Sequence, residues 1–153
     1  MKNCPVFLNI SNHPSSGWGE EQTAAALKLC RWENADGDII AEGKIIDIPF
    51  PTVPATAGTN EINRLAESLY SAILGVIDPA QSTDDPDCPP ATIHLMGEQA
   101  VCYCLTSHLR KMGLRVVVSS TEREVVEKDG VKTSVFRFVR FRALDEARFM
   151  SIQ

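Results

Sequence analysis

The 153-residue sequence has no apolar run near the roughly 18 residues that a membrane span requires. Its amino-terminal segment holds one lysine and an apolar stretch too short for a signal peptide. Positive charge is scarce as well, since 15 Lys and Arg against 20 Asp and Glu give a formal net charge of −5. These absences predict a cytoplasmic protein with no membrane segment, and they argue against a surface for duplex nucleic acid.

Familiar catalytic motifs are also missing. The sequence contains no GxGxxG, no Walker phosphate loop, no HExxH and no GxSxG, which disfavours the usual dehydrogenases, kinases, zinc proteases and esterases. Its five cysteines include no CxxC pair and are expected to be reduced thiols. Cys102 and Cys104 would lie on different faces of one helix. We therefore expect neither a metal site nor a cofactor.

What is present is the composition of an ordinary globular chain. Hydrophobic residues make up 44% of it and charged residues 23%. The length suits a single domain over residues 1–153, large enough to bury about two-thirds of the surface of the unfolded chain.

Predicted strands and helices alternate over the first 118 residues. Short apolar runs predict buried strands, and apolar residues at helical spacing predict helices between them. The strands are expected at 4–11, 44–48, 91–96 and 114–118, and the helices at 19–32, 59–77 (capped by Thr59) and 97–112. A proline-rich surface loop is expected at 79–90. This order predicts an α/β fold, a Rossmann-like and mostly parallel sheet flanked by helices and joined by right-handed crossovers.

The pattern after residue 118 predicts an antiparallel β-hairpin appended to that sheet. Segments 122–127 and 133–144 flank Lys128-Asp129-Gly130, which is a favourable turn sequence. The adjacent apolar residues Phe138 and Val139 interrupt the alternation of the second segment. They predict a β-bulge there.

Polar residues follow three of the predicted parallel strands, where open α/β sheets bind their ligands. They are Ser11, Asn12, His13, Ser15 and Ser16 after the first; Gly97, Glu98 and Gln99 after the third; and Ser119, Ser120, Thr121, Glu122 and Arg123 after the fourth. Hydroxyls, a glycine that permits close approach, helix-end N–H groups and a planar guanidinium suit a phosphodiester. The sequence predicts a phosphate-binding rim, and the alternative is a set of polar loops without a ligand.

Single residues of this rim have two interpretations each. His13 is either an acid–base group or a solvated loop residue. Trp18 either stacks on a base or belongs to the core. Glu98 is either a base or metal ligand, or an acid that complements the helix dipole. His94, inside an apolar strand, and His108, in mid-helix, are interpreted as structural.

The last third of the chain resembles a known family. The run Ser119-Ser120-Thr121-Glu122-Arg123, then Asp129-Gly130 and residues 136–142, is similar to the carboxyl half of small stand-alone CARF (CRISPR-associated Rossmann fold) proteins of type III CRISPR systems. Gly97-Glu98 and the loop after the first strand match more loosely. Ser120 stands where the family pattern has threonine, and the 79–90 loop has no counterpart in that pattern.

The resemblance implies a homodimer that binds a cyclic oligoadenylate, with cyclic tetra-adenylate favoured, across its two-fold axis. Some relatives cleave the ring without a metal ion. A ribose 2′-hydroxyl attacks the neighbouring phosphodiester in line, and the linear products carry a 2′,3′-cyclic phosphate, which switches off type III CRISPR signalling.

On this basis four residues are expected to be catalytic: Arg123, Thr121, Ser120 and His13. The expected ligand-binding residues are Ser11, Asn12, Ser15, Ser16, Trp18, Gly97, Glu98, Gln99 and Ser119. Two alternatives stay open. One is a non-catalytic sensor or sponge for the same ring, and the other is an unrelated small nucleotide-binding α/β protein.

Overall fold

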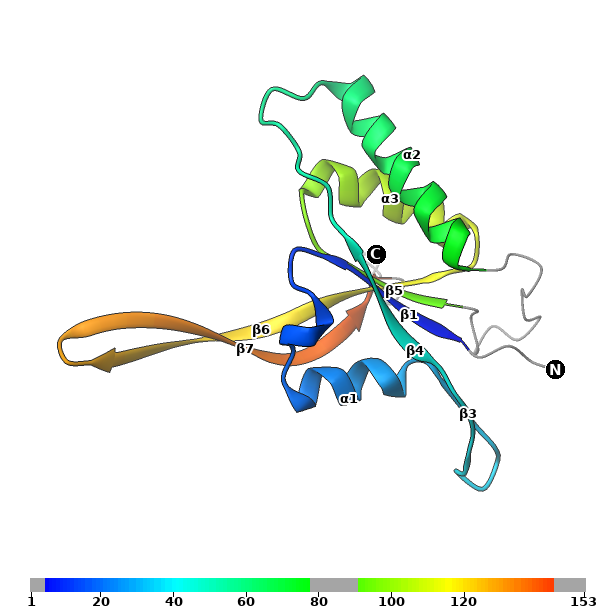
Figure 1. Ribbon diagram of the computed structural model, residues 1–153, viewed down its shortest axis with the longest axis horizontal. Coiled ribbons are helices and arrows are strands. Elements are labelled where there is room, and N and C mark those ends of the chain that lie inside the picture. Colours follow the sequence, from blue (N-terminus) through cyan, green and yellow to red (C-terminus); the bar gives the residue numbers. More distant parts are fainter. Residues whose placement is uncertain (1–4, 78–90, 145–153) are drawn as a thin grey trace, which may run out of the picture.

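A computed structural model describes residues 5–77 and 91–144 (Figure 1). The predicted α/β class is confirmed, because a mostly parallel five-stranded sheet is flanked by helices and ends in an antiparallel hairpin. The loop predicted at 79–90 lies outside the described residues. None of the helices in the described ranges is long and apolar enough to span a bilayer.

The sheet has the strand order β4-β1-β5-β6-β7. Its strands are β1 (Val6–Ser11), β4 (Lys44–Pro49), β5 (Ala91–Leu95), β6 (Arg115–Lys128) and β7 (Val131–Ala143). Strand β1 pairs in parallel with both β4 and β5, and β5 pairs in parallel with β6. Only β7 runs antiparallel, against β6.

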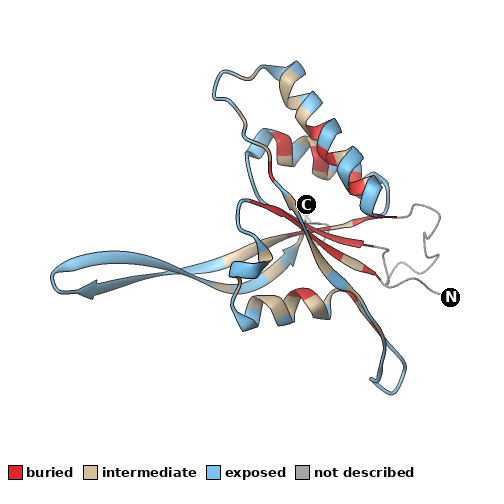
Figure 2. Ribbon diagram, in the orientation of Figure 1, coloured by how far each residue is buried: buried red, intermediate tan, exposed pale blue. Residues whose placement is uncertain are grey.

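Helices cover the two faces of the sheet unequally. Helix α1 (Glu20–Lys28) lies on one face, and α2 (Thr59–Val76) and α3 (Gln99–Lys111) pack together over the other (Figure 1). The larger apolar core lies under α2 and α3 and includes Leu8 and Ile93 of the central strands. Burial is concentrated on these central strands (Figure 2).

The helix predicted over 19–32 is wrong at its carboxyl end. Helix α1 stops short, and a strand, β2 (Arg31–Glu33), pairs antiparallel with β3 (Ile39–Glu42) in a separate two-stranded sheet. The Gly43 amide donates to the Cys30 carbonyl at 2.7 Å, and a Cβ on Gly43 would lie only 2.6 Å from that oxygen. The backbone at Gly43 therefore packs directly against Cys30, and residues 31–33 pair with β3 instead of continuing the helix. The local sequence does not indicate this contact.

One predicted helix cap differs from the structure, and the predicted hairpin turn agrees with it. The prediction that Thr59 caps its helix is wrong, since Gly58 is the N-cap and its carbonyl accepts the first helical hydrogen bond, from the Ile62 amide, at 3.0 Å. The hairpin turn is confirmed. Asp129 and Gly130 both have positive φ, 54° and 78°, which is the geometry of a type I′ turn.

Strand β6 continues without a break from Arg115 to Lys128, so the predicted end of a strand at residue 118 is wrong. Partner β7 pairs with it along this whole length, for example Ser119 with Phe141 and Arg123 with Phe136, and thereby satisfies the backbone of the polar segment. We call residues 119–141 the ribbon. It projects away from the helical layers (Figure 1).

The predicted bulge is confirmed at Val139. Ser120 is opposite Arg140 while Thr121 is opposite Phe138, which leaves Val139 as the extra residue of β7. The bulge has a consequence for the aromatic residues on either side of it. Phe138 and Phe141, three positions apart, lie on the same face with ring centroids 4.8 Å apart.

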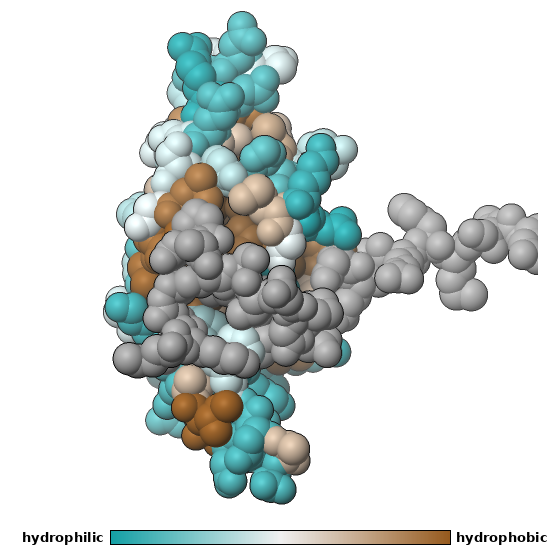
Figure 3. Space-filling model, turned by 90° about the vertical axis from the view of Figure 1, so that its right-hand side faces the viewer, coloured by the Kyte–Doolittle hydropathy of each residue, from teal (hydrophilic) through white to brown (hydrophobic). Residues whose placement is uncertain are grey.

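The side of the molecule opposite the ribbon carries both hydrophobic and hydrophilic groups (Figure 3). Hydrophobic groups are visible there between hydrophilic surfaces at the two ends of the view (Figure 3).

Candidate functional site

The carboxyl ends of β1 and β5 form the topological switch point of the sheet. After β1 the chain passes to α1 on one face, and after β5 it passes to α3 on the other (Figure 1). Open α/β sheets bind ligands at such a point. The loop after β1, with its short helix η1 (Ser15–Gly17), lies here and contains the first group of predicted rim residues.

Beneath this loop a polar network crosses three strands. Asp47, Asn9 and His94 are register partners on β4, β1 and β5. The Asn9 amide nitrogen donates to Asp47 Oδ1 at 2.8 Å and to the His13 carbonyl at 2.9 Å. Its Oδ1 accepts from the Ser11 hydroxyl at 2.9 Å and lies 2.9 Å from His94 Nδ1. All four hydrogen-bonding positions of the amide are used, so its orientation is determined.

His94 is therefore held as one neutral tautomer. Burial, with a smaller contribution from the nearby His13, lowers the pKa of His94 to about 4. Because Asn9 Oδ1 can only accept, Nδ1 of His94 carries the proton. The other ring nitrogen, Nε2, is a buried acceptor without a hydrogen-bond partner among the described residues.

Aromatic rings surround the His94 side chain. The ring centroid of Phe141 is 5.2 Å away, that of Trp18 5.8 Å and that of Phe7 6.3 Å. Trp18, predicted either to stack on a base or to belong to the core, packs in this cluster and is half-buried. It closes the α1 side of the sheet below the loop.

Asp47 places a negative charge at the same edge. Partial burial acts to raise its pKa, but hydrogen bonds from Asn9, the Ser15 hydroxyl (2.8 Å) and the Ser15 amide (3.1 Å) hold that pKa below its usual value. The carboxylate is ionised at neutral pH, and it engages the hydroxyl that was expected to bind phosphate.

A hollow of about 200 Å³ opens beside this carboxylate. It is lined by Asn9, Ser11, Asn12, Pro14, Asp47, Ile48, Pro49 and Phe50. The ionised Asp47 disfavours a phosphate here, whereas a neutral hydroxyl-bearing group such as a ribose suits the polar lining.

The start of α3 is occupied by the chain's own groups. Glu98 is the N-cap, and its Oε2 accepts from the Val101 amide at 2.9 Å. A Cβ on Gly97 would lie 2.4 Å from the ring of Phe50. The glycine thus makes room for Phe50, and Glu98 takes a helix-end donor that was predicted to serve a ligand. Gln99, the first residue of α3, is exposed.

The predicted group on β6 divides between two faces of the strand. Because side chains alternate, Ser119, Thr121 and Arg123 share one face and Ser120 lies on the other. The register places Ser119 level with Ser11, two strands away. Arg123 lies about 13 Å farther along the ribbon, at roughly 3.3 Å per residue.

The structure brings together only part of the predicted site. Ser11, Asn12, His13, Ser15 and Ser16 do lie in one segment at the switch point, and Ser119 is at the same edge. Thr121 and Arg123 are exposed on the ribbon.

Sequence reasoning did not single out Asn9 or Asp47, and it treated His94 as structural. A signal was present, because each is a polar residue inside an apolar strand segment: VFLNIS, KIIDIP and ATIHL.

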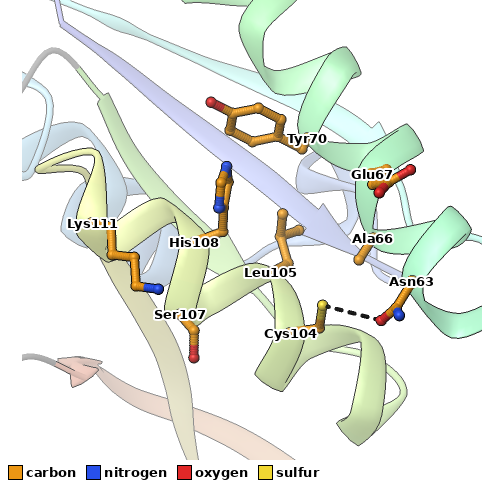
Figure 4. Close-up of a pocket in the computed structure, with 9 residues that line it drawn as sticks. All are labelled: Asn63, Ala66, Glu67, Tyr70, Cys104, Leu105, Ser107, His108 and Lys111. Carbon is orange, nitrogen blue, oxygen red and sulfur yellow. Dashed lines mark hydrogen bonds between the residues drawn. The ribbon is translucent and has the colours of Figure 1, made fainter. Parts of the chain in front are cut away.

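A second hollow, of about 300 Å³, lies between α2 and α3, away from the switch point (Figure 4). Leu105 and Ala66 are buried residues of its lining. Tyr70 and His108 meet edge to face across it with centroids 4.5 Å apart, and Cys104 Sγ lies 3.7 Å from the Asn63 side-chain oxygen (Figure 4). Nothing in the sequence pointed to this groove.

Comparison with protein-family models matches residues 5–142 to the family described as uncharacterized protein MJ1673 family. No curated protein and no solved structure matches the chain. In the described part of the chain, no three His, Cys, Asp or Glu residues are grouped so that they could hold a metal ion.

Proposed function

We propose that this chain, which belongs to the uncharacterized protein MJ1673 family, binds a cyclic oligoadenylate, with cyclic tetra-adenylate favoured. We propose further that it cleaves this ring without a metal ion to linear products with a 2′,3′-cyclic phosphate. It would act as a cytoplasmic homodimer of the CARF type and would switch off type III CRISPR signalling.

One observation carries this proposal. At the switch point between β1 and β5, Asn12, His13 and Ser16 of the first loop are exposed. Ser11, where this loop begins, is level with Ser119, the first of a row of side chains on β6 that can donate hydrogen bonds to phosphate. Ser119, Thr121 and Arg123 share one face of that strand and continue outward from the edge. A ligand with several phosphates and hydroxyls in one extended ring matches such a row better than a mononucleotide does.

The two carboxylates at this edge determine how the ring lies. Asp47 is ionised beside the hollow between β1 and β4, and Glu98 caps α3. Phosphates are therefore placed toward β6, against Ser119, Thr121 and Arg123. A ribose takes the hollow beside Asn12.

The chemistry needs alignment and charge stabilisation more than a protein nucleophile. A ribose 2′-oxygen attacks phosphorus and loses its proton to water, while the bond from phosphorus to the 5′-oxygen breaks. His13 donates a proton to that leaving oxygen, and the planar fork of Arg123 with the Thr121 hydroxyl stabilises the charge on the phosphate oxygens. Ser120, on the opposite face, is left outside this group.

The homodimer is part of the proposal for a geometric reason. Ser119 is level with the loop that contains His13, and Arg123 lies about 13 Å farther out along β6. One chain does not bring both groups to the same phosphodiester. A two-fold partner supplies the second group.

The test is to incubate the protein with cyclic tri-, tetra- and hexa-adenylate in EDTA and to follow binding and products by chromatography and mass spectrometry. We expect one ring to become linear with cyclic-phosphate ends. Arg123→Ala and Thr121→Val should slow this conversion, while Ser120→Ala, on the opposite face, serves as the matched control. If no ring binds, the proposal fails.

A second candidate function is a sensor or sponge that holds the ring intact. It is favoured by the separation of His13 and Arg123 within one chain, because a single chain does not bring both groups to one phosphodiester. Tight binding of a ring with no conversion at any protein concentration would establish that function. Binding of mononucleotides in preference to rings would instead point to an unrelated small nucleotide-binding protein.

A further inference from the structure

We propose that one face of the ribbon is a stacking platform for the bases of a short oligonucleotide. We call it the aromatic face, and its side chains are Ser119, Thr121, Arg123, Val125 and Glu127 of β6 and Lys132, Ser134, Phe136, Phe138 and Phe141 of β7. For a cyclic ligand this inference rests on the proposed ring-binding function. For a linear oligonucleotide it stands without that function.

The aromatic rings form a continuous row from the switch point outward. Trp18 and Phe141 have centroids 6.1 Å apart, and Phe141 and Phe138 have centroids 4.8 Å apart. Phe136 follows on the same face and is 66% exposed. The bulge at Val139 is what places Phe138 in line with Phe141. Phe136 is exposed, whereas Phe138 and Phe141 are half-buried. Aromatic side chains in such a row can stack on successive bases, whatever the base sequence.

A phosphate-binding group stands within this row. Arg123 is the direct cross-strand partner of Phe136. Its Nε donates to the Ser134 hydroxyl at 3.0 Å, which orients the guanidinium and leaves its two terminal nitrogens to face a ligand. A planar fork beside an aromatic ring can bind a backbone phosphate while the neighbouring base stacks.

The opposite face of the ribbon lacks these features. Next to Arg123 and Phe136 along the chain, it carries Glu122 and Glu124 on β6 and Val135 and Arg137 on β7. It has no aromatic ring between residues 119 and 141. Phe136 and its chain neighbours Val135 and Arg137 are all exposed, so these two neighbours are matched controls on the opposite face.

A nucleic-acid ligand explains the aromatic face better than a second copy of this chain does. A two-stranded ribbon with exposed apolar groups needs a covering partner. Packing two aromatic faces together would bury Arg123 of each copy against aromatic rings, and the nearest carboxylate on the same face of β6, Glu127, lies about 13 Å farther along the strand. A phosphate supplies the missing negative charge.

The experiment measures binding of fluorescein-labelled linear tetra-adenylate by anisotropy, and of cyclic tetra-adenylate by calorimetry, both in EDTA. Phe136→Ala and Phe138→Ala should each weaken binding by about 5- to 100-fold. Phe136→Leu keeps the apolar volume and should weaken it as well. Arg123→Ala should reduce the salt dependence of binding. Val135→Ala and Arg137→Ala should leave affinity unchanged, and circular dichroism checks that each variant folds.

The outcomes separate the two proposals. Wild-type ring binding and cleavage in Phe136→Ala and Phe138→Ala would overturn the platform and leave the proposed function standing. Linear adenylate that binds through Phe136 and Phe138, with no ring bound, would support the platform and overturn the ring function. If the substitutions change only the oligomeric state in light scattering, the face is an interface between copies and the platform is overturned.

Discussion

His94 offers the sharpest test of the buried network. The unfolded chain protonates this histidine near its usual pKa of 6.5, whereas burial lowers the pKa of the folded state to about 4. Between these values the unfolded state binds more protons than the folded state. The contribution of the neutral His94 to the free energy of unfolding is therefore fully present above pH 6.5, and it is lost as the pH drops toward 4.

The size of this effect follows from the two pKa values. Linkage gives a loss of about 2 kcal/mol between pH 7 and pH 5, before most carboxylates titrate. His94 is 3% exposed, so solvent screening does not reduce this figure much.

The assay is urea unfolding of the wild-type protein and His94→Gln at pH 7, 6 and 5. The stability difference between them should shrink by about 2 kcal/mol on acidification. Thr92→Val is the control. It changes the other buried polar side chain on this face of β5, which does not titrate, so this variant should keep the wild-type pH dependence. In nitrogen NMR, the ring of His94 should remain neutral at pH 5 with its proton on Nδ1.

Two results would show that folding does not lower the pKa of His94. Parallel pH dependence in the wild-type protein and His94→Gln would show that the histidine does not titrate differently on folding. Protonation of His94 near pH 6.5 in the NMR spectrum would show the same directly. Either result would mean that Nε2 of His94 is not an unprotonated, buried acceptor.

Further predictions concern packing, the edge carboxylate and the thiols. Gly43→Ala should cost about 3 kcal/mol or more in urea unfolding, because its Cβ would overlap backbone atoms, while Gly75→Ala, in open space on α2, should add about 0.5–1 kcal/mol. Asp47→Ala should cost about 1 kcal/mol at pH 7. That cost should disappear as the pH falls below 3.8, because the lowered pKa means that the carboxylate stabilises the fold only when ionised. Burial raises the pKa of Cys30 and of Cys102 to about 11, so iodoacetamide at pH 8 should label both only in urea, as peptide mapping will show.

Each of these predictions has a contradicting result. Equal stabilities of the two glycine variants would mean that the chain does not return as closely as described. A cost of Asp47→Ala that does not decrease as the pH is lowered below 3.8 would mean that the carboxylate is not the stabilising species. Rapid labelling of either thiol in the folded protein would mean that its pKa is not raised.

Local sequence determined the features that depend on neighbouring residues. The Asp129-Gly130 turn follows from the positive φ that these residues accept, and the bulge follows from the adjacent apolar pair Phe138 and Val139. The parallel sheet follows from the alternation of short apolar runs with helices of 3.6-residue period. The signals for the turn and the bulge each lie in a short segment, whereas the alternation of strands and helices extends over the first 118 residues.

The length of β6 and the site beside it depend on contacts between segments that lie far apart in the sequence. Polar residues 119–121 indicated a strand end, but pairing with β7 satisfies their backbone and carries the strand on to Lys128. The network of Asn9, Asp47 and His94 joins residues as much as 85 positions apart in the sequence. Strand order and register bring such residues together, and they depend on how helices pack on a sheet, which no single segment of the sequence encodes.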